Sequence, residues 1–129
     1  DITLTGKLDG YYDGSASAIV ERPPSDTYKT FLKGCKKLDD NYDKIVAGSI
    51  VGGDFQGTGK VTEIISSEPY TVFKVQLSSG KEIVCVNRSA KSTINSSDVK
   101  EKKQVMGTLK GLYTDGATPY LWVWFVLNK

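Results

Sequence analysis

The sequence contains no histidine, and it contains only two cysteines and one methionine among its 129 residues. Histidine is the commonest general base near neutral pH and the commonest metal ligand. Clustered cysteine thiolates are the other usual ligands of zinc and of iron–sulfur groups. These absences argue against a zinc, copper or haem site, so we expect no metal site and no cofactor.

The chain also lacks a strong net charge and a long apolar run. Its 17 basic and 15 acidic side chains leave a formal net charge of +2. The field of the whole protein is therefore weak, and nucleic acid is a possible partner that the charge does not favour. The apolar run at residues 120–127 is far shorter than the roughly 20 residues of a membrane-spanning helix. We expect no membrane span.

No initiator methionine opens the chain, which starts Asp-Ile-Thr. We interpret this start as that of a processed mature chain or an excised domain, with no signal segment remaining. We therefore expect an exported protein, located in the periplasm, on the cell surface or outside the cell.

Two cysteines, Cys35 and Cys85, lie 50 positions apart. In an exported protein they would form one disulfide, which stabilises by roughly 4 kcal/mol in the chain-entropy model for such a loop. The alternative is a cytosolic protein in which both side chains are buried free thiols. Both interpretations stay open, and the disulfide is the one that accompanies export.

What the sequence does contain is typical of one folded domain. Hydrophobic residues make up 39% and charged residues 25% of the chain, as in globular proteins. A chain of this length buries a substantial core, so we expect a single domain over residues 1–129.

The first 58 residues predict a hairpin, a helix and a loop. Alternating apolar residues between positions 2 and 21 indicate a β-hairpin that turns at Asp13-Gly14. A single helix is expected at about residues 26–38. Its apolar stripe comprises Tyr28, Phe31, Leu32, Cys35 and Leu38. Asp39-Asp40-Asn41 would end this helix or begin a turn, and the glycines at 52–59 would bracket a mobile loop around Asp54 and Phe55.

From Gly59 onward the pattern is that of β-strands. Expected strands are Lys60–Ser66, Tyr70–Leu77, Glu82–Asn87, Gln104–Thr114 and Tyr120–Leu127. A long polar connection over residues 88–103 separates the third strand from the fourth.

The last strand is apolar on both faces at period two. One face carries Tyr120, Trp122, Trp124 and Val126, and the other carries Leu121, Val123, Phe125 and Leu127. Such a strand is either covered on both faces or uses one of them for binding.

A short internal similarity relates two segments of the chain. Residues 6–12 and residues 107–113 both read Gly-x-Leu-x-Gly-x-Tyr. Glycines at every fourth position allow a sharp bend or the close approach of another backbone. We interpret the two segments as similarly coiled strand-turn units, with chance similarity as the alternative.

The strand pattern resembles that of bacterial exported OB-fold proteins over residues 59–127. Matching segments are Gly59-Lys-Val61-Thr-Glu-Ile64, Val72–Leu77, Ile83-Val-Cys85, Val105-Met-Gly107 and Gly111. The resemblance implies a mainly β fold, namely a small Greek-key OB-like barrel at 59–127. Residues 1–58 would add the N-terminal β-hairpin and the one α-helix.

In OB-folds, ligands usually lie on the second and third strands, between two flanking loops. The resemblance places the ligand-binding residues at Tyr70, Lys74 and Gln76, with Tyr120, Trp122 and Trp124 added if the aromatic face of the last strand is exposed. Aromatic residues beside lysines suit stacking on bases or sugars. The competing interpretation is that the hairpin and the helix cover this aromatic face.

Three classes of function compete. The favoured one is a non-catalytic binding or interaction module, exported, that engages a protein partner or an extended ligand. The alternative is an OB-fold protein that binds single-stranded nucleic acid or a glycan. A histidine-free enzyme would need two carboxylates at a working separation, and nothing in the sequence fixes such a pair, so we do not expect an enzyme.

Overall fold

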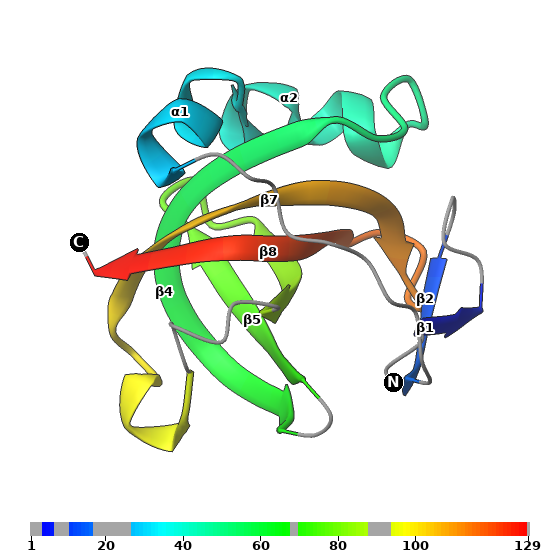
Figure 1. Cartoon of the computed structure of the whole chain (residues 1–129). Helices are drawn as coiled ribbons and strands as arrows, with labels where there is room; N and C mark the ends of the chain where they lie inside the picture. The colour runs from blue at the N-terminus through cyan, green and yellow to red at the C-terminus, as the bar shows by residue number, and fades with distance from the viewer. Residues whose placement is uncertain (1–3, 7–10, 17–26, 68–69, 88–93, 129) are drawn as a thin grey trace.

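Five strands close on one another to form a barrel in the computed structural model (Figure 1). The structure describes residues 4–6, 11–16, 27–67, 70–87 and 94–128. The barrel strands are β4 (Asp54–Ser66), β5 (Thr71–Leu77), β6 (Glu82–Asn87), β7 (Lys102–Tyr113) and β8 (Pro119–Asn128). The mainly β fold class and all five strands predicted after residue 59 are confirmed.

The order of the strands around the barrel is β4-β5-β6-β8-β7, and β7 pairs back onto β4 to close it. Only β6 and β8 run parallel among these neighbours, and the other four pairs are antiparallel. This topology is compatible with an OB-like barrel. Closure leaves the barrel strands paired on both sides over much of their length, so few unpaired backbone groups face solvent there.

The strand β4 is longer than the sequence predicts and includes Asp54 and Phe55. Both residues pair with β7, at Thr108 and Gly107 respectively. The expected mobile loop around them is wrong, because this pairing and the burial of the Phe55 ring outweigh the local glycine signal. The long β4 wraps around the barrel in Figure 1 and connects the helical end to the opposite end.

Two glycines permit the tight coiling of the barrel strands. A Cβ atom built on Gly107 would overlap the backbone carbonyl of Trp122, and one on Gly59 would overlap that of Gln76. At both positions the obstacle is backbone, which cannot rotate away as a side chain can. The close approach expected from the glycine pattern at residue 107 is confirmed.

The barrel interior forms one apolar cluster that the second helix, α2 (Leu38–Val46), covers at one end. Interior residues from the strands include Val61, Phe73, Val75, Leu77, Ile83, Cys85, Val105, Leu121 and Val123. Leu38 and Ile45 of α2 join the same cluster and are almost fully buried. Full burial of such a side chain contributes about 1.5–3 kcal/mol, so the helix is held to the barrel chiefly by these residues.

The predicted helix at residues 26–38 is present but shorter. Helix α1 (Tyr28–Lys33) ends at Gly34, and a two-residue strand, β3 (Lys36–Lys37), pairs in parallel with β4 before α2 begins. Glycine is a weak helix former, and the break lets Leu38 enter the barrel end. The expected helix end or turn at Asp39-Asp40-Asn41 is wrong, because these residues belong to α2. Asp39 and Asp40 stand in its first turn, where negative charge stabilises a helix.

The N-terminal hairpin is confirmed as a pairing of β1 (Leu4–Gly6) with β2 (Tyr11–Ala16). Its predicted turn at Asp13-Gly14 is wrong, because both residues lie within β2. Pairing with β1 on either side of them, Gly6 with Tyr12 and Leu4 with Ala16, carries the strand through the expected turn. The connection at residues 7–10 and the predicted return strand beyond residue 16 lie outside the described residues.

The two Gly-x-Leu-x-Gly-x-Tyr segments are not structural equivalents. Gly6 lies on β1 and pairs with Tyr12 on β2. Gly107 and Tyr113, in contrast, belong to the same strand, β7. The interpretation as two similarly coiled units is therefore wrong, and the sequence similarity does not reflect a repeated unit of structure.

Cys35 and Cys85 are free thiols. Cys85 points into the barrel interior, whereas Cys35 follows α1 and packs outside the barrel beside Phe31 and Met106. The predicted disulfide is wrong because the barrel wall separates the two sulfurs. Burial, with a smaller effect from the negative charge of Asp54, raises the pKa of Cys35 to about 12, and burial also raises the pKa of Cys85.

Candidate binding groove

The aromatic side chains of the last strand are packed rather than displayed. Tyr120 and Trp122 are each 1% exposed, and Trp124 is 5% exposed. Tyr120 and Trp122 contact a cluster on the outer face of the barrel, and Trp124 packs with Phe31 of α1 in a separate cluster. This face was expected either to be exposed for binding or to be covered by other parts of the fold. Its burial supports coverage.

A β-bulge changes which residues of β8 share a face. Met106 of β7 pairs with Phe125, and the next residue pairs with Val123, so Trp124 has no partner in the register. Beyond the bulge the alternation is reversed. Val126 therefore lies in the barrel interior, while Phe125 packs on the outside with Trp124. The predicted grouping of Val126 with the tryptophans is wrong for this reason.

Polar contacts further fix the two indole rings. Trp124 Nε1 donates to Thr108 Oγ1 at 3.1 Å, and this hydroxyl donates to Asp54 Oδ1 at 3.0 Å. Trp122 Nε1 donates to the hydroxyl of Tyr120. The ammonium group of Lys110 lies 4.2 Å from the centre of the Trp122 ring, which is within the range of a cation–π contact.

The remaining predicted site residues, on or beside β5, differ in their surroundings. Lys74 forms an ion pair of 3.6 Å with Glu63, and Tyr70 packs partly buried against the outer cluster. Gln76 is exposed, and its amide donates to the carbonyl of Gly80 at 3.5 Å. The structure therefore brings Lys74 and Gln76 onto the outer face of β5, but it does not bring them together with exposed aromatic rings.

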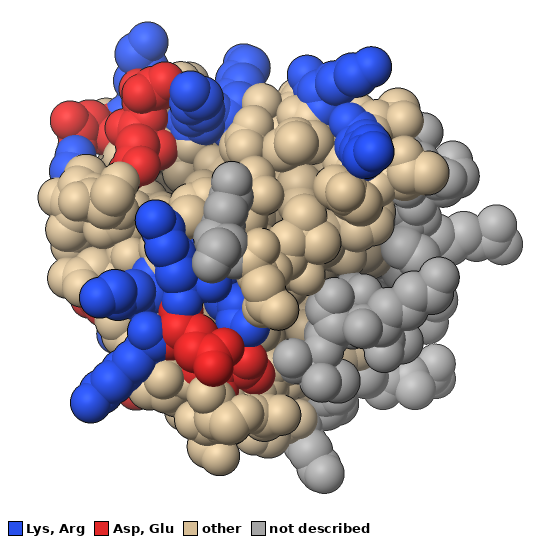
Figure 2. Space-filling view, turned by 90° about the vertical axis from the view of Figure 1, so that its left-hand side faces the viewer, with Lys and Arg blue, Asp and Glu red and all other residues tan. Residues whose placement is uncertain are grey.

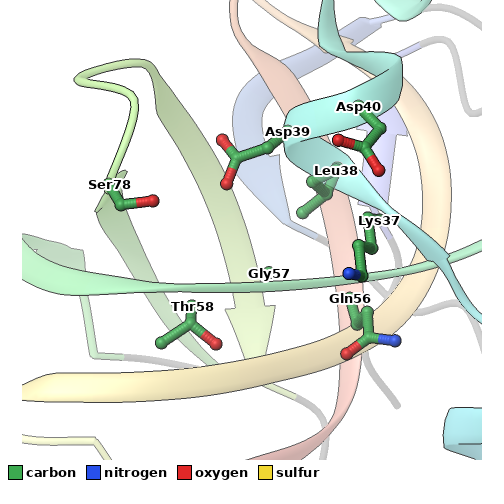
Figure 3. A pocket seen from close by; sticks show the side chains of 8 residues that line it. All are labelled: Lys37, Leu38, Asp39, Asp40, Gln56, Gly57, Thr58 and Ser78. Atoms are coloured by element: carbon green, nitrogen blue, oxygen red, sulfur yellow. The ribbon is translucent and has the colours of Figure 1, made fainter.

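The described surface carries two adjacent hollows that meet over β4. Each has a volume of about 300 Å³. The first is lined by Lys37, Leu38, Asp39, Asp40, Gln56, Gly57, Thr58 and Ser78 (Figure 3). The second is lined by Thr58, Gly59, Lys60, Gln76, Leu77, Ser78 and Lys102. The two hollows share Thr58 and Ser78 and therefore lie side by side, and we call them together the β4 groove.

Four elements position the walls of the β4 groove. Gln56, Thr58 and Lys60 alternate along β4, so their side chains share one face of the strand. The turn between β5 and β6 supplies Ser78, and the N-terminus of α2 supplies the opposite wall (Figure 3). Gln104 of β7 donates to Gln56 at 3.2 Å, which orients the amide of Gln56 beside the groove.

One end of the groove is basic. Lys60 and Lys102 stand directly opposite each other in the antiparallel pair of β4 and β7. Both are exposed and both line the second hollow. No carboxylate of the described residues forms an ion pair with either ammonium group.

The other end of the groove carries more negative than positive charge. Asp39 accepts a hydrogen bond of 2.8 Å from the hydroxyl of Ser79, and its carboxylate points toward the Ser78 side of the hollow in Figure 3. Asp40 and Lys37 line the same hollow. The groove thus has two carboxylates and one ammonium group at the α2 end and two ammonium groups at the β7 end.

An ion cluster around the buried Lys103 lies close to the basic end. Lys103 follows Lys102, and its side chain, 8% exposed, pairs with Asp98 at 3.0 Å and with Glu101 at 3.2 Å. It also donates to the side chain of Asn128. Desolvation alone would raise the pKa of Asp98, but hydrogen bonds from Asn95 and Lys103 outweigh it, so the pKa is lowered. The carboxylates of Asp98 and Glu101 are therefore both ion-paired with Lys103.

Charged side chains gather in two places on the side of the molecule shown in Figure 2. An upper group, over the helices, mixes lysines with carboxylates. A lower group sets lysines beside a compact carboxylate patch. Charge on this face is therefore clustered, and each of the two groups contains charges of both signs.

The sequence did identify one residue of the groove, Gln76. The other groove residues were not predicted, because the groove is formed by β4, β7, α2 and the turn after β5, which are distant from one another in the sequence. The alternation of the polar residues Gln56, Thr58 and Lys60 is typical of one face of a strand. It did not lead to a prediction, because residues 52–59 were interpreted as a loop.

The described ranges contain neither a membrane-spanning helix nor a metal-binding cluster. No helix there is long and apolar enough to cross a membrane. No group of three or more cysteine, aspartate or glutamate side chains in the same ranges is placed to hold a metal ion.

No protein-family model matches the sequence, and no curated protein matches it either. The likeness to OB-folds therefore depends on the closed barrel and on the order of its strands.

Proposed function

We propose that this protein is a non-catalytic binding module that engages an extended segment of a protein partner in the β4 groove. The observation that carries the proposal is that two hollows lie side by side along β4 and share Thr58 and Ser78 as lining residues. Two open, adjacent hollows that offer both hydrogen-bonding side chains and apolar surface suit a chain in extended conformation, whereas ligand pockets for small molecules are usually enclosed.

The composition of the groove favours a peptide over the alternative ligands. No aromatic side chain lines either hollow, whereas binding of single-stranded nucleic acid depends on stacking of bases on aromatic rings. The carboxylates at the α2 end would also repel a chain of phosphates. A peptide can present amides to the glutamine, serine and threonine side chains and can carry charges of both signs.

The barrel topology is compatible with the resemblance to exported OB-fold proteins, and we propose that relationship at the level of fold. The proposed ligand site differs from the expected one. It lies over β4 rather than on the face of β5 and β6 where OB-fold ligands usually bind. Export stays a prediction, and with Cys35 and Cys85 unpaired a disulfide no longer supports it.

Selection of peptides on the folded protein tests the proposal. A library of random linear peptides is displayed against the wild type, and bound peptides are then measured by fluorescence anisotropy. Thr58→Trp places a bulky ring where the two hollows meet. Thr62→Trp is the matched control, because Thr62 is an exposed threonine on the same strand that lines neither hollow.

The proposal predicts peptides that bind the wild type and Thr62→Trp with equal affinity and lose at least about tenfold in affinity for Thr58→Trp. Circular dichroism confirms that each variant is folded. Selection of no peptide, or equal binding by all three proteins, would overturn the proposal. Binding of an oligonucleotide or a polysaccharide in the same groove would favour the alternative function instead.

A further inference from the structure

We infer that Lys60 and Lys102 form a receptor for an acidic side chain of the bound segment, so that the β4 groove selects peptides with a carboxylate at its β7 end. This inference depends on the proposed function and specifies the chemistry of the ligand. The two lysines stand opposite each other in the strand register and line the same hollow.

The arrangement of the two lysines is unfavourable in the absence of a ligand. Like charges directly opposite each other on neighbouring antiparallel strands repel and destabilise the pair. Here neither lysine forms an ion pair within the described ranges.

The carboxylates that adjoin these lysines in sequence or in space are engaged with other partners. Glu101 precedes Lys102 in the chain but pairs with Lys103 at 3.2 Å. Glu63 lies three residues after Lys60 and pairs with Lys74 at 3.6 Å. An anion supplied by a ligand would therefore meet two ammonium groups without displacing an internal ion pair.

Neutral groups of the same hollow complete the receptor. The amide of Gln76 and the hydroxyl of Thr58 are the neutral side chains that can donate hydrogen bonds there, alongside Ser78. A carboxylate between two ammonium groups gains charge-assisted hydrogen bonds, which are stronger than neutral ones. It also removes the repulsion between Lys60 and Lys102.

The opposite end of the groove sets the direction in which a charged segment binds. Asp39 and Asp40 there also stabilise the first turn of α2, so they are not a ligand site in their own right. Their negative charge nevertheless disfavours an anion at that end. A peptide with an acidic residue is therefore expected to place it beside Lys60 and Lys102.

Two short peptides and a set of lysine variants test the inference. The probes are a peptide of alternating glutamate and serine and its counterpart in which glutamine replaces glutamate. Binding is followed by NMR on the nitrogen-15-labelled protein, through the backbone amides of Lys60, Gln76 and Lys102. The variants are Lys60→Gln and Lys102→Gln. Lys29→Gln is the control, because Lys29 is an exposed lysine of α1 outside both hollows.

We expect the glutamate peptide to bind about tenfold more tightly than the glutamine peptide, with shifts centred on these three amides. Each groove variant should remove most of this difference, Lys29→Gln should leave it unchanged, and Lys60→Arg should preserve it. Added salt should weaken binding of the glutamate peptide more strongly than binding of the glutamine peptide.

Three results would overturn the inference. Equal binding of both peptides in the groove would show that the groove does not select a carboxylate, which refutes the inference but not the proposed peptide-binding function. Equal losses in Lys60→Gln and Lys29→Gln would indicate attraction by net charge alone. If neither peptide shifts any groove amide, while an oligonucleotide of thymidines does, both the inference and the peptide-binding function are wrong.

Discussion

Lys60 of β4 and Lys102 of β7 face each other across an antiparallel strand pair, and neither forms an ion pair within the described part of the chain. Proteins tolerate such a cost where stability is exchanged for function, as in ligand sites. The pair lies at one end of the β4 groove, and the other end carries Asp39 and Asp40 beside Lys37.

Removing one charge of this pair should stabilise the protein. We expect Lys60→Gln to raise the free energy of unfolding by about 0.2–1 kcal/mol at low ionic strength, because like charges opposite each other repel. The gain should shrink in 1 M salt, where the screening length is about 3 Å. Urea unfolding at both salt concentrations measures it, with Lys29→Gln as control. A loss of stability, or a gain independent of salt, would contradict this view.

The backbone contact at Gly107 should be sensitive to a single methyl group. A Cβ there would overlap the carbonyl of Trp122, so Gly107→Ala must shift one of two paired strands. We expect a loss of about 1–3 kcal/mol in the free energy of unfolding, measured by chemical denaturation.

Gly34→Ala is the matched control for this substitution. Its Cβ would meet only the carbonyl oxygen of Phe31, at an ordinary contact distance of 3.6 Å, and its φ of −89° suits alanine. We expect a change within about 0.5 kcal/mol. If both alanine variants behave alike, the close packing of β7 against β8 is not the reason for Gly107.

The Asp98–Lys103 pair predicts how stability depends on acid. The pKa of Asp98 is lower in the folded protein than its ordinary value of 3.8. A lowered pKa contributes stability that is present above the unfolded value and is lost as pH falls through the folded value. The free energy of unfolding should therefore drop as pH falls below about 3.8, and Asp98→Asn should flatten this drop. Identical pH profiles for both proteins would refute the assignment.

The two thiols should be free but differ in accessibility. After denaturation without reductant, a thiol reagent should detect both Cys35 and Cys85. In the native protein both should react slowly at pH 8, because burial raises the two pKa values and the thiolate is the reactive form. Cys85 should be the slower one, since it lies in the barrel interior. Absence of free thiols in the denatured protein would restore the disulfide and the argument for export.

The sequence predicted the barrel well because its signals are local. Alternating apolar residues and turn residues place β5 and β6 within one or two positions of the observed bounds. Errors arose where a contact distant in sequence decided the local structure. Pairing with β7 converts Asp54 and Phe55 from an expected loop into strand, and the entry of Leu38 into the barrel end accompanies the break at Gly34.

The candidate site was harder to predict, for two physical reasons. The bulge at Trp124 depends on the register between β7 and β8, which no property of a single strand reveals. The groove depends on which polar residues of β4, β7 and α2 come together. Only Gln76 of the predicted ligand-binding residues lines it, because the resemblance to OB-folds places ligands on β5 and on the aromatic strand rather than over β4.

The most direct test of the central claim is the affinity of a selected peptide for three proteins: wild type, Thr58→Trp and Thr62→Trp. The groove account predicts that Thr58→Trp loses at least about tenfold in affinity and that Thr62→Trp binds like the wild type. Equal affinities for all three folded proteins would show that the peptide binds elsewhere and would contradict the account.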